Sequence, residues 1–283
     1  MNANVQAFFD KATSTVTYLV SDPATKAAAI IDPVLDFDPR SARISTGSAD
    51  ALLAAVEAQG LALEWILETH AHADHLSAAD YLRHHSGAKV VIGDHIRTVQ
   101  RTFDALFETE TDGRVFDRLV HDGDELELGG LAVRVLHTPG HTPACVTYLI
   151  GDAAFVGDTL FMPDYGTARA DFPGGDAATL YRSIRRILDL PAATRIFVGH
   201  DYLPSGRRHF EWETTVADER ARNIHVHDGV SETAFVTMRE ARDATLAAPT
   251  LILPSLQVNI RAGALPEPSG KGRVFLKLPV NAL

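Results

Sequence analysis

Residues 69–75 read Thr-His-Ala-His-Ala-Asp-His and place three imidazoles and one carboxylate within six positions, at His70, His72, Asp74 and His75. Neutral imidazole and carboxylate are the usual protein ligands of zinc and of divalent iron. The segment joins a predicted strand at 64–69 to a predicted helix at 76–85, so alternate side chains of the turn can converge on one point. A plainer interpretation, in which Asp74 caps that helix and the histidines are solvated, accounts for one residue of the four. The cluster therefore predicts a metal site.

Three further ligand-type residues follow later apolar segments that end in a turn. They are His141 in Thr-Pro-Gly-His-Thr-Pro, Asp158 in Val-Gly-Asp-Thr-Leu and His200 in Val-Gly-His-Asp-Tyr. Each alone is a weak signal, because a single His or Asp after a Gly is usually a turn residue. Together, and after the dense cluster, they predict one metal centre built from seven side chains. The spacing His-x-His is not sufficient by itself: His225 and His227 follow no strand, and we expect them in a solvated loop.

The elements that must position these residues are short strands mixed with helices. Apolar runs bounded by turn residues predict strands at 16–20, 27–31, 64–69, 89–92 and 195–198, and hairpins across 125–136 and 145–156. Helices are predicted at 48–59, 76–85 and 176–190. Residues 93–121 are polar and indicate an irregular excursion from the core. A block of strands followed by strands mixed with helices predicts sheet-on-sheet packing covered by helices.

Composition excludes several classes of protein. The 283 residues are 46% hydrophobic and 22% charged, which is typical of a globular chain. The net charge of −11 disfavours DNA or RNA as a partner, because binding a polyanion requires Lys and Arg. The single cysteine, Cys145, excludes an intramolecular disulfide, and we interpret it as a small buried hydrophobe. The sequence shows neither a secretory signal nor an apolar run of about 18 residues. We therefore expect a cytoplasmic protein with no nucleic-acid or membrane partner.

In this order, the motifs THAHADH, TPGHTP, GDTLF and GHDY resemble the metallo-β-lactamase fold superfamily, over about residues 16–202. The resemblance implies an α/β fold, a four-layer αββα sandwich with metal at one edge. We expect residues 1–283 to form a single domain of this type. It would carry the excursion at about 93–121 and a Pro- and Gly-rich C-terminal extension from about residue 254. The fold serves many chemistries and does not by itself set the reaction.

Other segments resemble the persulfide dioxygenases, the ethylmalonic encephalopathy protein family, and within it the bacterial β-lactamase-like branch. These segments are GTARADF at 166–172, TLYRSI at 179–184 and LQVNIRAG at 256–263. The family oxidises glutathione persulfide, or a related low-molecular-weight persulfide, with O2 to sulfite and a free thiol, in sulfide detoxification. Three positions depart from its pattern. Ala168 replaces a Gly, Thr167 stands where many relatives have Cys, and His225 falls where relatives tend to place a basic residue.

The resemblance implies one Fe²⁺ per chain, held by His70, His141 and Asp158, with no catalytic residue beyond the metal site. Two imidazoles and one carboxylate leave positions open for a persulfide sulfur and O2. The other four residues either orient ligands and bound water or build a second site, for two Zn²⁺ or a mixed Fe/Zn pair. They are His72, Asp74, His75 and His200. A dinuclear site would suit a glyoxalase II-type thioester hydrolase. A non-catalytic metal-dependent sensor or binding module is a third alternative.

Substrate capture is predicted at Arg169 and Tyr202. Glutathione carries two carboxylates, and a guanidinium binds a carboxylate through two parallel hydrogen bonds. Arg169 lies in the GTARADF segment, and Tyr202 offers a hydroxyl two positions after His200. In the alternative interpretation Arg169 is a structural partner of Asp171. The expected partners are a small-molecule persulfide and O2, and a homodimer is left open.

Overall fold

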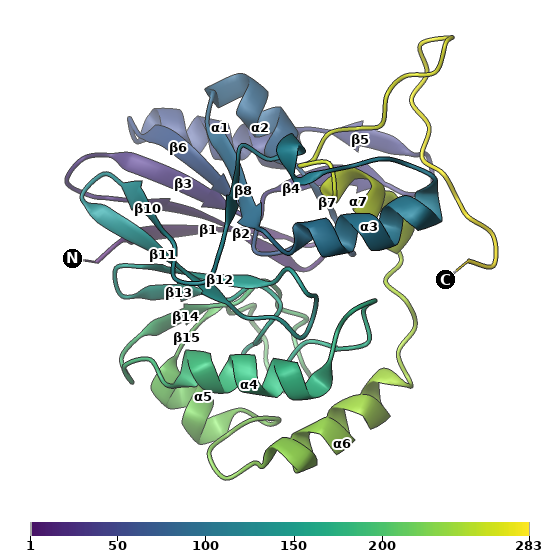
Figure 1. The fold of residues 1–283 in the computed structure, drawn as a ribbon. Helices are drawn as coiled ribbons and strands as arrows, with labels where there is room; N and C mark the ends of the chain where they lie inside the picture. The colour runs from purple at the N-terminus through teal and green to yellow at the C-terminus, as the bar shows by residue number, and fades with distance from the viewer. Residues whose placement is uncertain (1, 283) are drawn as a thin grey trace.

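Two six-stranded sheets packed face to face form the centre of the computed structural model, which describes residues 2–282 (Figure 1). The first sheet has the order β1 (Asn4–Asp10), β2 (Thr15–Ser21), β3 (Ala27–Ile31), β6 (Ala62–Leu67), β8 (Lys89–Gly93) and β9 (Arg118–Val120). The second has the order β10 (Glu125–Leu128), β11 (Leu131–His137), β12 (Val146–Ile150), β13 (Ala153–Phe155), β14 (Arg195–Phe197) and β15 (Glu213–Thr215). A small sheet joins β5 (Arg43–Ser45), β4 (Val34–Asp38) and β7 (Leu76–Ser77).

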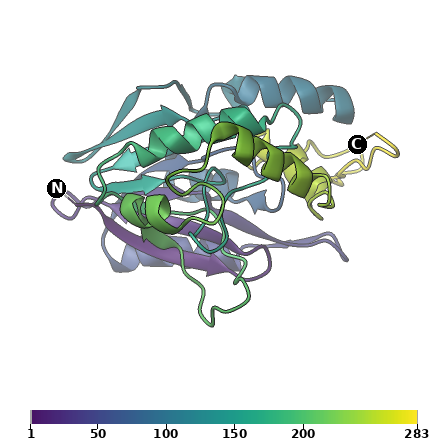
Figure 2. The same ribbon diagram turned by 90° about the horizontal axis from the view of Figure 1, so that it is seen from below.

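Helices cover the outer faces of both large sheets. The first sheet carries α1 (Gly47–Ala58), α2 (Ala79–Ser86), α3 (Ile96–Phe107) and α7 (Ile252–Asn259), and a 3-10 turn at Gly113–Val115 follows α3 (Figure 1). The second sheet carries α4 (Ala177–Leu188), α5 (Val216–Arg222) and α6 (Glu232–Asp243). Figure 2 shows α4 and α6 side by side on the outside of the molecule. The predicted four-layer αββα sandwich is thus confirmed.

Apolar clusters fill the three spaces between the four layers. Ile66 of β6 belongs to the same cluster as Leu82 of α2. Between the sheets, the rings of Tyr18 and Phe155 lie 5.3 Å apart. Ile184 of α4 belongs to the third cluster, with strands of the second sheet. Because both faces of the central strands are covered, these strands are nearly continuous apolar runs rather than alternating ones.

Residues 93–121 form regular structure and not the irregular excursion that the sequence indicated. Helix α3 buries Ile96, Val99, Phe103 and Phe107 against the first sheet, and β9 forms the edge strand of that sheet. These four residues recur at intervals of three and four positions, the spacing of one helix face. The polar residues between them made this helical pattern hard to recognise in the sequence.

The region beyond residue 254 also differs from the expected extension. Helix α7 begins at Ile252, and Leu256, Val258 and Ile260 lie in the core over the first sheet. Beyond these residues the chain runs along the outside of the molecule (Figure 1), with Phe275 62% exposed. Among the described residues, no helix is both long enough and apolar enough to cross a membrane.

Candidate metal centre

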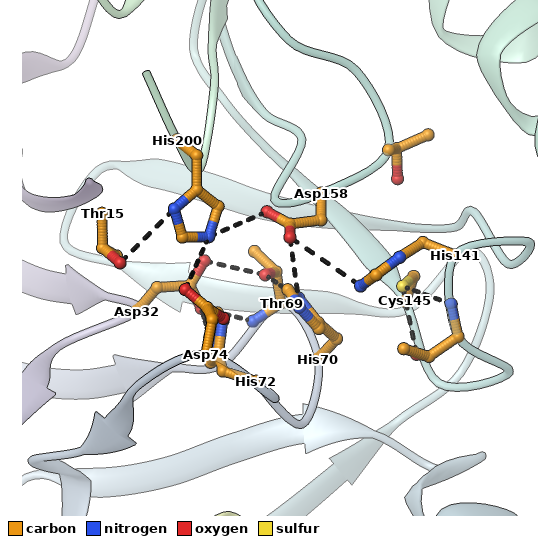
Figure 3. A network of polar contacts seen from close by, with 12 residues as sticks. Thr15, Asp32, Thr69, His70, His72, Asp74, His141, Cys145, Asp158 and His200 are labelled. Atoms are coloured by element: carbon orange, nitrogen blue, oxygen red, sulfur yellow. Dashed lines mark hydrogen bonds and ion pairs between the residues drawn. The ribbon is translucent and has the colours of Figure 1, made fainter. Parts of the chain in front are cut away.

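The seven predicted ligands meet at one edge of the sandwich, where loops from both sheets converge. Figure 3 labels all of them except His75. The loop after β6 carries His70, His72, Asp74 and His75, and the loops after β11, β13 and β14 carry His141, Asp158 and His200. Helix α2 begins at Ala79, with Ala78 as the residue before its first turn. Asp74 therefore does not cap this helix, and the plainer interpretation of that residue is wrong.

Two imidazoles and one carboxylate face each other in the first group. The Nε2 atoms of His70 and His141 lie 3.9 and 3.8 Å from the same oxygen, Oδ2 of Asp158. One ligand atom from each of the three residues lies within 4.8 Å of the others. Two imidazoles and a carboxylate presented on one face are the donor set of mononuclear non-haem iron sites.

Hydrogen bonds fix which nitrogen of each imidazole is available. His141 donates from Nδ1 to the carbonyl oxygen of Arg169, at 2.8 Å. The hydroxyl of Thr69 donates to Oδ2 of Asp32 at 2.7 Å, so its oxygen accepts from Nδ1 of His70, 3.0 Å away. Since Nδ1 carries the proton in both imidazoles, both Nε2 atoms present lone pairs to a cation.

A second group lies directly beside the first. It consists of His72, Asp74, His75 and His200, whose ligand atoms also fall within 4.8 Å of one another. Nε2 of His200 is 3.4 Å from Oδ2 of Asp74 and 3.3 Å from Oδ1 of Asp158. The Asp158 carboxylate therefore reaches both groups, one oxygen toward each.

The residues present fit a metal cation, because buried polar atoms in both groups lack hydrogen-bond partners. In the part of the chain that the structure describes, the atoms without a hydrogen-bond partner of acceptable geometry include Nε2 of His70, Nδ1 of His72, Oδ2 of Asp74, Nε2 of His75, Oδ1 of Asp158 and Nε2 of His200. Buried polar groups are nearly always hydrogen-bonded, so such a concentration requires an explanation. A cation would satisfy carboxylate oxygens and imidazole lone pairs together.

Two further buried acids, Asp32 and Glu68, hold His72, and the sequence interpretation missed both. Oδ1 of Asp32 lies 3.0 Å and Oε2 of Glu68 lies 3.3 Å from Nε2 of His72. Asp32 also accepts from the backbone N–H of Thr69 at 2.7 Å, and it does so from a left-handed backbone with φ of 50°. The signal was present: Asp32 follows the apolar strand β3, just as Asp158 follows β13.

The pKa values of two imidazoles in the centre, those of His70 and His72, are shifted in opposite directions. Burial and then the neighbouring imidazoles hold the pKa of His70 well below its ordinary value, which keeps it neutral. Burial also acts to lower the pKa of His72, but the carboxylates of Asp32 and Glu68 outweigh it and raise that pKa well above the ordinary value. Cys145 is 2% exposed, and burial raises the pKa of its thiol to about 12. It therefore remains a protonated thiol, and proximity to the centre does not activate it.

A cavity of about 510 Å³ opens onto the centre, with Asp74, His141 and Asp158 in its wall. Arg169 and Tyr202 both line it. Each of the three guanidinium nitrogens of Arg169 already donates a hydrogen bond, however. The guanidinium binds both carboxylate oxygens of Asp171, and Nη1 donates to the carbonyl oxygen of Ala247 at 2.7 Å. This geometry favours the structural interpretation of Arg169.

The side chains of Tyr202 and Arg242, also in the wall, are free to meet a ligand. Tyr202 is 41% exposed and stacks on the ring of His200, with centroids 5.5 Å apart. Its hydroxyl forms no hydrogen bond within residues 2–282. Arg242 is exposed at the same cavity, and its guanidinium has no ion-pair or hydrogen-bond partner in that part of the chain. The cavity thus offers the hydroxyl of Tyr202 and the uncompensated positive charge of Arg242 to a ligand.

His225 is half-buried and not solvated as predicted. Its Nδ1 accepts from the backbone N–H of Thr167 at 3.1 Å, beneath the loop that leads to Arg169. Burial, followed by the charges of Arg239 and Arg242, lowers the pKa of His225 to about 4. It is therefore a neutral support for this loop. His227 is exposed, as expected.

Comparison with known proteins agrees with this geometry. The sequence model of the metallo-beta-lactamase superfamily matches residues 11–200, which contain all seven residues of the centre. The chain belongs to the metallo-beta-lactamase superfamily. Within this superfamily it is 55% identical to a probable metallo-hydrolase of Burkholderia pseudomallei, over 99% of both chains. It is equally similar to a beta-lactamase hydrolase-like protein of Xylella fastidiosa, but spans only 65% of that protein's length.

The resemblance to persulfide dioxygenases is also confirmed. The chain is 33% identical to the human mitochondrial persulfide dioxygenase ETHE1, over 77% of this chain and 74% of the human one. The crystal structure of ETHE1 from Myxococcus xanthus superposes with a TM-score of 0.75 and 34% identity, covering 92% of this chain and 100% of the other.

Proposed function

We propose that this chain is an iron-dependent persulfide dioxygenase. It would oxidise glutathione persulfide, or a related low-molecular-weight persulfide, in sulfide detoxification. The reaction consumes one persulfide, one O2 and one water, and yields one thiol, one sulfite and two protons. The observation that carries the proposal is the convergence of His70 and His141 on one oxygen of Asp158. Similarity to ETHE1 over most of the chain supports it.

When bound, Fe²⁺ would supply the redox chemistry toward O2 and the sulfane sulfur. The chain's own contribution is orientation. The carbonyl oxygen of Arg169 holds the ring of His141, and Thr69 holds that of His70. Outer hydrogen bonds of this kind fix ring orientation and raise the basicity of the nitrogen that faces the metal.

The cavity beside the centre suits a small anionic substrate. Its volume of about 510 Å³ falls within the usual range for ligand pockets. The chain is acidic, with a net charge of −11, so an anion needs local positive charge. Arg242 provides that charge and has no partner in the described part of the chain, and Tyr202, which stacks on the ring of His200, provides a hydroxyl. We therefore place a glutathione carboxylate at Arg242 and retain Tyr202 as a substrate contact.

A dinuclear thioester hydrolase is the second candidate, and a specific observation favours it. The group of His72, Asp74, His75 and His200 offers four donor side chains for a second cation, and the Asp158 carboxylate reaches both groups. The name of the Burkholderia relative, a probable metallo-hydrolase, is consistent with this candidate. Two cations sharing a carboxylate would lower the pKa of a bound water and generate a nucleophile.

One experiment separates the candidates. The protein is purified anaerobically, its metals are counted, and oxygen uptake is recorded after addition of glutathione persulfide. Hydrolysis of a glutathione thioester is assayed on the same sample. We expect about one iron per chain and oxygen uptake matched by sulfite. Two metals per chain with thioester hydrolysis and no oxygen uptake would refute the dioxygenase, and stable metal with neither activity would favour a sensor. We further propose that the chain forms a single domain and that the protein is cytoplasmic.

A further inference from the structure

The segment Leu256–Gly263 resembled a family element in the sequence, yet none of its residues is among the metal ligands. In the fold it forms the end of α7, which packs against β7 directly after the metal loop (Figure 1). Asn259, the last residue of that helix, is 4% exposed. Its side chain points into the loop that carries His72, Asp74 and His75.

Three hydrogen bonds join the Asn259 amide to the backbone of this loop. Nδ2 donates to the carbonyl oxygens of His72 and His75, at 2.7 and 2.8 Å. Oδ1 accepts from the N–H of Ser77, at 2.8 Å. Residues 71–75 form no helix or strand, so these carbonyls have no partner in regular structure. One amide thus satisfies three buried backbone groups that would otherwise be unpaired.

Ser77, which is bound by Asn259, also connects to a buried acid next to His72. The hydroxyl of Ser77 donates to Oε1 of Glu68, and Oε2 of Glu68 lies 3.3 Å from Nε2 of His72. Asn259 therefore holds the backbone of His72 directly and lies two hydrogen bonds away from the group that faces its ring. A change at Asn259 would alter both the position and the orientation of this imidazole.

Helix α7 is itself held firmly from the opposite side. Leu256, Val258 and Ile260 lie in the core over the first sheet. Gln100 of α3 donates from Nε2 to the carbonyl oxygen of Ile260, at 2.9 Å. The amide of Asn259 is therefore presented from a packed element, which is what precise support of a site requires.

We propose that Asn259 is a positioning residue of the metal centre. It sets the backbone path of residues 72–77, so that Asp74, between its two carbonyl contacts, and the two flanking histidines face the first group of ligands. The inference rests on the metal centre of the proposed function and not on the reaction. It applies equally to a mononuclear and to a dinuclear centre.

The test measures metal affinity in the full-length chain. Asn259→Ala removes all three hydrogen bonds, and Asn259→Ser leaves a small polar side chain with room for a bridging water. The matched control is Gln257→Ala in the same helix. Gln257 is 3% exposed and binds the backbone of Lys277 in the C-terminal segment, not the metal loop. Fe²⁺ is titrated anaerobically against a competing chelator, and the absorption spectrum of the Co²⁺-loaded protein reports ligand geometry.

We expect both Asn259 variants to bind Fe²⁺ roughly 10–100-fold more weakly, the usual effect of losing an outer contact, with a changed Co²⁺ spectrum. Gln257→Ala should lower the melting temperature of the metal-free protein and retain wild-type affinity. If Asn259→Ala does not fold, Asn259→Ser decides alone. A folded Asn259 variant with wild-type affinity and spectrum would overturn the inference. Wild-type protein that binds iron without oxygen uptake would instead refute the proposed function and leave this inference standing.

Discussion

Glu219 of α5 is a fully buried acid with one side of its carboxyl unpartnered. Oε2 accepts from Nδ2 of Asn223 at 2.7 Å, while Oε1 has no hydrogen-bond partner within residues 2–282. Burial raises the pKa of Glu219 from 4.5 to about 8. Asn223 also donates to the carbonyl oxygen of Gly166, at the start of the loop that reaches Arg169. The protonation of Glu219 therefore bears on the stability of one wall of the cavity.

The sign of the effect follows from the direction of the shift. The folded state prefers the protonated acid, so this stabilisation is complete below about pH 4.5 and is lost progressively as the pH rises to about 8. At pH 7, Glu219 is ionised in the unfolded chain, because this pH lies about 2.5 units above its ordinary pKa of 4.5. In the folded chain, Glu219 is still mostly protonated at this pH. At about 1.4 kcal/mol per unit, this lowers the free energy of unfolding by about 3 kcal/mol.

Glu219→Gln removes this penalty, because the neutral amide has the shape of the protonated acid and still accepts from Asn223. We expect the melting temperature at pH 8 to rise by roughly 5–10 °C and the difference to vanish near pH 4.5. Thermal unfolding followed by circular dichroism across this range measures it. Glu240→Gln, at an exposed position of α6, is the control and should change nothing. A melting difference that is independent of pH, or a loss of stability at pH 8, would refute the reasoning.

Four further predictions concern the centre and its cavity. His141→Ala should lose most bound iron and stay folded, since an open three-ligand site has no spare donor; full iron content with full activity would remove His141 from the site. His200→Ala should keep near-stoichiometric iron with activity reduced roughly 10–100-fold, whereas metal content halved from two per chain would favour the hydrolase. Cys145→Ser should retain substantial turnover, because its thiol stays protonated; abolished turnover at normal iron content would contradict this. Arg169→Lys should lower melting temperature or iron loading with an unchanged KM, whereas Arg242→Ala should raise KM at constant iron; the opposite pattern would exchange their roles.

The sequence was sufficient to identify the ligands as one group, because residue type alone shows which side chains can bind a metal. Imidazoles and carboxylates that follow strand ends can be recognised without any coordinates. Asn259 and Glu68 could not be recognised in that way. The carboxylate of Glu68 faces the imidazole ring of His72. Asn259 binds the backbone carbonyls of His75 and His72, which lie 184 and 187 positions away in the sequence. Neither residue type is specific to such a role.

The same limit applies to the fold. Strands buried on both faces were visible as apolar runs, and both sheets follow from them. Helix α3 was missed because polar residues lie between its four buried apolar residues, so that the average composition of the segment resembles that of a loop. Strand β1 was missed because it is an edge strand with only partly buried side chains. The role of Arg169 was ambiguous in the sequence. Its pairing with the nearby Asp171 could be anticipated, but its hydrogen bond to the carbonyl oxygen of the distant Ala247 could not.

The ligands come from both sheets: His70 follows a strand of the first, and His141 and Asp158 follow strands of the second. The interior between the sheets is mainly apolar. Near the metal centre, the hydroxyl of Tyr18 donates to the carbonyl oxygen of Val198, and the hydroxyl of Tyr148 donates to that of Glu68, so hydrogen bonds also join the two halves there. A cation bound at this edge would act as a crosslink between the halves, closing a loop of about 90 residues between His70 and Asp158. Release of the metal would remove this crosslink and lower the free energy of unfolding, while the protein stays folded. Chelation would loosen the whole molecule, and metal supply would set how long the protein survives proteolysis.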